Sequence, residues 1–208
     1  MAPLWLSVWC GMIGVYAKNF HGVWFGVACN EKSIFATSFG STEERILRDL
    51  LDNIPFNVPF QNYAKTSAFA ENMLTLLKDI YDGKDVSERF PLATDHLSEY
   101  MRCVIMITSL IPVGYVASYG SVARAAGGSP RAVGRVMATH PFAPIVPCHR
   151  VVSSDLTLGG YGGGLDMKLA FLIREKRGYT AEREISVDGG KKLRVFPVEF
   201  VLKKLGKG

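Results

Sequence analysis

The spacing of apolar and polar residues in the first half of the chain predicts strands followed by helices. Segments rich in Trp, Val, Tyr and Phe, bounded by turn residues, predict three strands, at residues 5–17, 23–30 and 33–39. Asn-Phe-His-Gly at 19–22 could join the first two as a hairpin. Helices are predicted at 42–53 and 67–81. Ser41 precedes the first of these helices, with Glu44 at the capping-box spacing.

A break at Asp82-Gly83 and a linker-like stretch over 84–97 divide the chain. We therefore expect two domains. Residues 1–90 are predicted to form an α/β domain with a small antiparallel sheet and helices, and residues 98–208 a mainly α domain.

The second half is predicted to contain short helices at 98–110 and 121–126, followed by a turn at Gly127-Gly128. Ser129-Pro130 then supplies a capping hydroxyl and a proline at the first helical position, a strong start signal. Two short helices joined by a glycine-containing turn are typical of a helix-turn-helix. The local pattern alone favours an ordinary helical hairpin.

The content of the second of these helices is more informative. Arg131, Arg135 and Ala138 share one helical face. Ala132 and Gly134 are small, which would let the backbone approach a partner closely. Glycine within a helix costs about 1 kcal/mol relative to alanine, so something should compensate. Contact with nucleic acid is one candidate, and tight helix packing is the commoner one.

The charge distribution adds a partner class. The chain has 208 residues, 48% apolar, and a formal net charge of +5. Residues 1–110 carry a net charge of −3 and residues 111–208 a net charge of +8. No acidic residue lies between Glu99 and Asp155, an interval with five arginines. A polyanion partner and a basic surface kept for solubility both fit this pattern.

The cysteines and the N-terminus indicate the cellular setting. Four cysteines are too few for a secreted disulfide framework in a chain of this length. The apolar stretch to Tyr16 lacks the basic start of an export signal, and no run is long enough to span a membrane. We expect a soluble cytoplasmic protein, or a nuclear one in a eukaryote.

Pro147-Cys148-His149-Arg150-Val151 is the most distinctive string in the chain. Neighbouring positive charge or a basic partner lowers the pKa of a cysteine, so we predict a reactive thiolate at Cys148. A glycine-rich stretch, Gly-Gly-Tyr-Gly-Gly-Gly at 159–164, follows. A reactive cysteine behind a possible DNA-reading helix indicates chemistry on a base.

The span from about Met101 to Tyr179 closely resembles the C-terminal domain of the O6-alkylguanine-DNA alkyltransferases, the methylated-DNA–protein-cysteine methyltransferases. Five elements carry the resemblance in order. They are Pro112-Val113-Gly114 running on to Val116-Ala117-Ser118-Tyr119-Gly120, then Arg131-Ala132-Val133-Gly134, Pro147-Cys148-His149-Arg150-Val151, Tyr161-Gly162-Gly163-Gly164 and Glu175. Residues 1–95 resemble the family's N-terminal domain mainly by order of elements.

The resemblance implies a suicidal DNA repair transferase that uses no cofactor. Cys148 would accept the alkyl group in a single turnover, and His149, held by Glu175, would act on it through a water. From the residues alone, Cys148 could be a buried apolar thiol and Glu175 a solvated helix charge. In an extended segment neighbouring side chains point to opposite faces, so we expect no direct contact between His149 and the thiol.

The resemblance also implies double-stranded DNA containing O6-alkylguanine as the partner of a monomeric protein. The target nucleotide must be flipped out of the duplex. Arg131 would fill the vacated stack, and Tyr119 would contact both a phosphate and the guanine. The remaining implied DNA contacts are Ala132, Gly134, Arg135 and Ser154, and the implied pocket residues are Val151, Tyr161, Gly162 and His140.

Two departures from the family pattern matter. His140 stands where the family usually has an Asn that ties the recognition helix to the active-site loop. Some relatives carry zinc in the N-terminal domain, but for Cys10 and Cys29 two unpaired thiols or a disulfide are favoured.

Two other function classes remain open. One is a DNA-damage-binding module of the alkyltransferase-like type, which lacks the cysteine. The other is a Cys-His hydrolase, which needs a histidine that reaches the thiol directly.

Overall fold

The computed structural model describes residues 12–55, 58–62, 66–86 and 90–207. The chain divides into two compact units, neither of which is one continuous segment. The first unit comprises Met1–Lys78, Ser87–His96 and Pro141–Ala143, and the second comprises Asp79–Val86, Leu97–His140 and Pro144–Gly208. The division into domains 1–90 and 98–208 stays a prediction.

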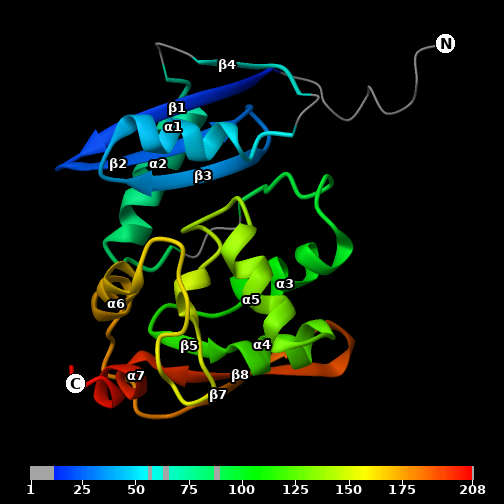
Figure 1. Cartoon of the computed structure of the whole chain (residues 1–208), viewed down its shortest axis with the longest axis vertical. Helices are drawn as coiled ribbons and strands as arrows, with labels where there is room; N and C mark the ends of the chain where they lie inside the picture. Colours follow the sequence, from blue (N-terminus) through cyan, green and yellow to red (C-terminus); the bar gives the residue numbers. More distant parts are fainter. Residues whose placement is uncertain (1–11, 56–57, 63–65, 87–89, 208) are drawn as a thin grey trace. The chain divides into compact units, whose positions relative to one another are not determined.

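The first unit is built on a four-stranded sheet (Figure 1). Its strands are β1 (Ile13–Phe20), β2 (Val23–Cys29), β3 (Ile34–Gly40) and β4 (Phe60–Asn62), in the order β3-β2-β1-β4. The predicted antiparallel hairpins are present, with His21 and Gly22 at positive φ in the β1–β2 turn. β4 was not predicted and pairs parallel to β1. The part of the predicted 5–17 strand before Met12 lies outside the described residues.

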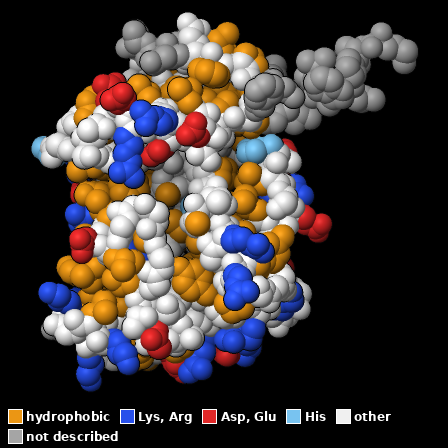
Figure 2. Space-filling view, in the orientation of Figure 1, with side chains coloured by type: hydrophobic (Ala, Val, Ile, Leu, Met, Phe, Trp, Pro, Cys, Tyr) orange, Lys and Arg blue, Asp and Glu red, His pale blue; other side chains and the backbone are white. Residues whose placement is uncertain are grey.

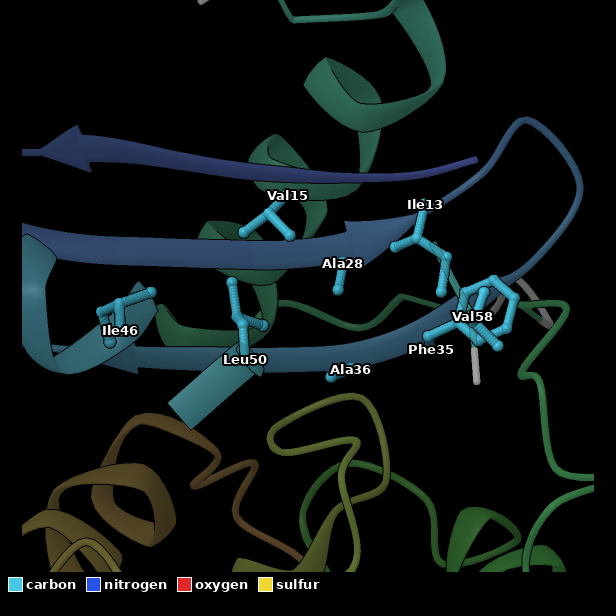
Figure 3. Close-up of a cluster of buried hydrophobic side chains, with 8 residues drawn as sticks. All are labelled: Ile13, Val15, Ala28, Phe35, Ala36, Ile46, Leu50 and Val58. Carbon is cyan, nitrogen blue, oxygen red and sulfur yellow. The ribbon is translucent and has the colours of Figure 1, made fainter. Parts of the chain in front are cut away.

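Helices α1 (Glu43–Leu51) and α2 (Ala68–Tyr81) match the two predicted ones. Thr42, and not Ser41, caps α1, because the Thr42 side chain accepts from the Arg45 amide. Ile46 and Leu50 of α1 pack into the apolar cluster on the sheet shown in Figure 3. A Cβ at Gly26 would lie 2.3 Å from Ile46, so the missing side chain lets α1 approach the strand.

The second unit contains five helices and a second four-stranded sheet among its described residues (Figure 1). The helices are α3 (Glu99–Ser109), α4 (Tyr119–Ala126), α5 (Pro130–Thr139), α6 (Leu165–Arg174) and α7 (Val198–Lys204). The strands are β5 (Tyr115–Ser118), β6 (Val151–Val152), β7 (Arg183–Val187) and β8 (Lys191–Pro197), in the order β6-β5-β8-β7.

The helices of the expected mainly α domain are therefore present, but the sheet beside them was not predicted. The sequence indicated no role for the residues after Tyr179. In the structure they form β7, β8 and α7. β8 pairs with the buried strand β5. Three α7 side chains share a core cluster with Val116, Val152 and Leu172: Val198, Val201 and Leu202. The sheet was missed because β5 and β6 are only four and two residues long.

The two helices α4 and α5 follow the predicted start signals. Ser129 caps α5 by accepting from the Ala132 amide, and Pro130 occupies the first turn. Ser118 caps α4, which therefore begins at Tyr119 and not at Ser121. Gly127 in the connecting turn has a φ of 75°, a conformation that favours glycine.

Two features are absent from the described residues. None of their helices combines the length and the apolar character needed to cross a membrane. No group of three or more His, Cys, Asp or Glu residues among them could hold a metal ion. Cys29 is buried, whereas Cys10 lies outside the described residues. Whether the two are unpaired thiols or form a disulfide therefore stays untested.

Candidate active site

Cys148 opens a short 3-10 helix, Cys148–Arg150, between Pro147 and β6. The expectation of an extended segment here is wrong. Because β6 pairs parallel to β5, the chain after Cys148 runs beside the strand that leads into Tyr119 and α4. The thiol is 5% exposed.

A cavity of about 650 Å³ brings most of the predicted site residues together. It is lined by Tyr119, Pro130, Arg131, Gly134, Arg135, Met137, Ala138, Cys148, Gly160, Tyr161 and Gly162. The thiol thus shares one cavity with the arginine-bearing face of α5 and the glycine-rich loop. A Cβ at Gly134 would have no atom nearer than 4.0 Å, so tight helix packing does not require this glycine.

Six predicted site residues do not line the cavity: Ala132, His140, His149, Val151, Ser154 and Glu175. Val151 is fully buried, and its carbonyl accepts from Lys168. His140 is the C-cap of α5, and burial lowers its pKa to about 4. Ser154 is exposed in the turn after β6.

Glu175 anchors the two basic residues that follow the cysteine. Its Oε1 lies 2.8 Å from His149 Nε2, and its two oxygens accept from Arg150 at 2.8–3.1 Å. His149 and Glu175 are fully buried. The His149 ring stacks on Phe171 with centroids 4.4 Å apart, which fixes the ring plane. His149 Nδ1 has no hydrogen-bond partner among the described residues.

Arg150 is a partner of Glu175 that the sequence did not reveal. It donates to both carboxylate oxygens and to the Ile111 carbonyl at 2.7 Å. In the 3-10 helix the side chains of His149 and Arg150 both reach the Glu175 carboxylate. In the extended segment that we expected, neighbouring side chains would point to opposite faces. Bidentate pairing with a guanidinium holds a carboxylate in one orientation.

Within this cluster, the pairing of Glu175 with its basic partners lowers the pKa of Glu175 and acts to raise that of His149. Burial acts in the opposite direction on each group. Burial acts to raise the pKa of Glu175, but His149 and Arg150 prevail and lower it to about 2. Burial lowers the pKa of His149 below its usual 6.5, against the attraction of Glu175. At neutral pH the pair is therefore a carboxylate and a neutral imidazole.

Lys168 is a second residue that the sequence reasoning missed. It is fully buried on α6, and its Nζ donates to the carbonyls of Val151 at 2.6 Å and Gly160 at 3.1 Å. Burial lowers its pKa to about 8, against the pull of Cys148. A signal was present, because Lys168 lies three residues after Leu165 and four before Leu172, on the apolar stripe of the helix.

The thiol itself departs from the sequence-based expectation. Burial raises the pKa of Cys148 to about 11, the opposite of the predicted direction. Lys168, the backbone amide of His149 and the Tyr161 hydroxyl act to lower it, but they do not overcome desolvation. The cysteine is thus held as a protonated thiol beside a neutral imidazole.

Tyr119 and Tyr161 form part of the cavity wall. The Tyr119 hydroxyl donates to the Gly160 carbonyl at 3.2 Å, the carbonyl that also accepts from Lys168. Burial and the neighbouring Cys148 both raise the pKa values of the two tyrosines, so both stay protonated donors at neutral pH.

Comparison with known families and proteins gives one consistent result. Residues 99–177 match the family model described as 6-O-methylguanine DNA methyltransferase, DNA binding domain. A methylated-DNA–protein-cysteine methyltransferase of Methanothermobacter thermautotrophicus is 44% identical over 78 residues, 38% of this chain and 44% of the relative. The Mycobacterium leprae protein of the same name is 40% identical over 115 residues, 54% of this chain and 68% of the relative.

Solved structures resemble more of the chain. The O6-methylguanine-DNA methyltransferase of Pyrococcus kodakaraensis has a TM-score of 0.60 at 26% identity, covering 79% of this chain and 99% of the other. A Mycobacterium tuberculosis relative solved in complex with DNA has a TM-score of 0.62 at 25% identity, covering 78% and 92%. The chain spans about half the length, or less, of several curated relatives that it matches. Together with the M. leprae match, these findings show that the chain belongs to the methylated-DNA–protein-cysteine methyltransferase family.

Proposed function

We propose that this chain repairs O6-alkylguanine in DNA by moving the alkyl group irreversibly to its own Cys148. The observation that carries the proposal is the buried Glu175–His149 pair next to the only cysteine that lines the described cavity. Family membership supports the same activity. Each chain would act once, because the carbon–sulfur bond of a thioether is not readily broken by water or by a protein side chain.

The reaction balances within the cavity without a redox partner. The sulfur of Cys148 forms a bond to the alkyl carbon while the bond from that carbon to guanine O6 breaks. The electron pair stays on the guanine, and the proton that the thiol loses is returned to the guanine through His149 and water, so that neutral guanine and neutral imidazole result. The thiol proton moves to His149 Nδ1 through a bridging water, because Nε2 already faces Glu175.

The neutral imidazole makes His149 a base, and Glu175 stabilises the imidazolium that forms. In this arrangement Glu175 orients the base His149, which removes the proton from the nucleophile Cys148. Removing the proton during the reaction suits a thiol whose pKa burial has raised to about 11. Lys168 supplies positive charge to the thiolate as it develops, and it holds the Val151 carbonyl and the carbonyl of Gly160, which lines the cavity.

DNA would enter by the α4–α5 face, which we propose acts as a helix-turn-helix. Figure 2 shows Lys and Arg side chains gathered over the region of these helices on the visible face. Arg131 and Arg135 line the cavity at its α5 side, where Arg131 would replace the flipped guanine in the stack. The Gly162 amide would face guanine O6, and Ser154 would contact a phosphate.

A DNA-damage-binding module without transfer is the second candidate. The basic α5 face would serve that function equally well. Cys148 distinguishes the two, because a pure binding module has no use for a buried thiol beside an oriented base. A hydrolase is disfavoured, because it needs a histidine in direct contact with the thiol, whereas among the described residues His149 Nε2 bonds Glu175 and Nδ1 has no hydrogen-bond partner.

The test is incubation of the chain with O6-benzylguanine followed by intact-mass measurement. We expect the mass of one benzyl group per chain with the wild type and none with Cys148→Ser. Duplex DNA containing O6-methylguanine should still bind to Cys148→Ser. A benzyl group on Cys29 or Cys103, or a wild type that stays unmodified, would overturn the proposal.

A further inference from the structure

The segment after Tyr179 lies outside the matched family segment, yet it is built into the second unit. β8 is hydrogen-bonded to β5, the strand that leads directly into Tyr119 and α4. The side chains of α7 complete the core around Val116. Because the hairpin β7–β8 is fixed at β5, its charged side chains hold defined positions relative to α4.

Most of the basic side chains on this hairpin are already engaged. Lys192 pairs with Glu184 at 2.7 Å, and Arg194 pairs with Glu182. The guanidinium of Arg183 stacks over the ring of Tyr115. Lys191, by contrast, forms no ion pair with a carboxylate of the described residues.

Lys191 instead reaches the turn between α4 and α5. Its Nζ donates to the Ala125 carbonyl at 3.1 Å, and it lies 3.9 Å from where a Cβ of Gly127 would stand. β8 packs against α4, as Figure 1 shows for the orange-red hairpin. An ammonium has three donors, so two remain after the bond to Ala125.

The surroundings of this turn favour an anion. The chain from Tyr100 to Ser154 contains no acidic residue, so the turn brings no negative side chain of its own. Arg124 on α4 and Arg131 on α5 flank it. In a helix-turn-helix the first helix crosses the DNA backbone, where lysines contact phosphates, and Lys191 bonds the last turn of that first helix.

We propose that Lys191 contacts a DNA phosphate beside the α4–α5 turn, so that the hairpin β7–β8 forms part of the DNA-binding surface. The proposal rests on the proposed function for the direction from which DNA approaches. It assigns to the C-terminal segment a backbone contact that strengthens binding without reading sequence.

The test is the salt dependence of binding of the full chain to a fluorescent duplex, with Lys191→Gln compared against Lys192→Gln. Glutamine keeps a donor for the Ala125 carbonyl and removes the charge. Both variants change net charge equally, but neighbouring strand residues face opposite sides of the sheet. Each phosphate contact contributes about 0.9 to the slope of log K against log salt concentration.

We expect Lys191→Gln to reduce the slope by about 0.9 and Lys192→Gln to leave it unchanged. Transfer from free O6-benzylguanine should be equal in all three proteins, since Lys191 does not line the cavity. An unchanged slope for Lys191→Gln, or equal reductions in both variants, would overturn the inference. Failure of the proposed function would appear separately, as a wild type that accepts no benzyl group.

Discussion

At the scale of single residues, Cys148 rests as a protonated thiol, and His149 would activate it by removing the proton. Burial keeps the Cys148 thiol protonated, with a pKa raised to about 11. Burial also keeps His149 neutral, and Glu175 holds its Nε2. The Cys148 thiol would then lose its proton while the alkyl group is transferred, and no thiolate would have to form beforehand.

The pH dependence of benzylation tests this division. Rates with O6-benzylguanine should fall as pH drops through the pKa of His149, below 6.5, because a protonated imidazole cannot accept the thiol proton. His149→Ala should lose that limb and react appreciably only as pH rises towards the thiol pKa of about 11. Superimposable pH–rate profiles would show that His149 takes no part.

Lys168 gives a prediction of its own. Lys168→Met should raise the pKa of Cys148 further, because it removes the cation that favours the thiolate. Each unit of that rise lowers the thiolate fraction about tenfold below the pKa. The rate of Cys148 modification by iodoacetamide against pH measures it, and Lys168→Arg should restore part of the loss. Equal behaviour of the Met and Arg variants would contradict the electrostatic role.

At the scale of elements, the proposed function places on α5 the residues that would distinguish duplex DNA from a free base. Its start is fixed by Ser129 and Pro130, so Arg131 has a defined position at the cavity. The glycine at 134 leaves space on the same side of the helix. The element thus combines a cation with room for close approach.

Arg131→Ala should slow repair of duplex DNA far more than reaction with free O6-benzylguanine. Only the duplex requires base flipping, which costs a few kcal/mol, so we expect a roughly 10- to 100-fold selective loss. Single-turnover rates on both substrates measure the ratio. The exposed Arg102 of α3 provides the matched control, and Arg102→Ala should leave both rates unchanged. Equal losses for Arg131→Ala on both substrates would show that it shapes the pocket instead.

At the scale of the whole chain, the segment after Tyr179 is part of the second unit's core. Leu202 is 1% exposed and packs with Val116 and Leu172. Leu202→Ala should lower the free energy of unfolding by roughly 2–5 kcal/mol. Lys203→Ala, at the exposed neighbouring position, should change it by no more than about 0.5 kcal/mol. Urea denaturation measures both, and equal small effects would mean that α7 does not support the core.

What the sequence predicted depends on how local each signal is. The Ser129 cap acts within one turn, so the start of α5 followed from the sequence. The sheet β6-β5-β8-β7 joins strands far apart in the chain, and no local pattern reports such pairing.

The same distinction holds within the site. Cys148, His149 and Glu175 followed from the resemblance. The Arg150–Glu175 pair and the burial of Lys168 depend on tertiary contacts, and so does the pKa of the thiol, which burial shifts against the predicted direction.

The most direct measurement follows a labelled methyl group from O6-methylguanine in duplex DNA to the protein. Digestion and mass spectrometry locate the label, and nucleoside analysis reports the DNA product. We predict one methyl group per chain, on the peptide that contains Cys148, with unmodified guanine restored in the DNA in equal amount. A label that stays on the DNA, is released as a free product, or appears on another residue would contradict transfer to Cys148.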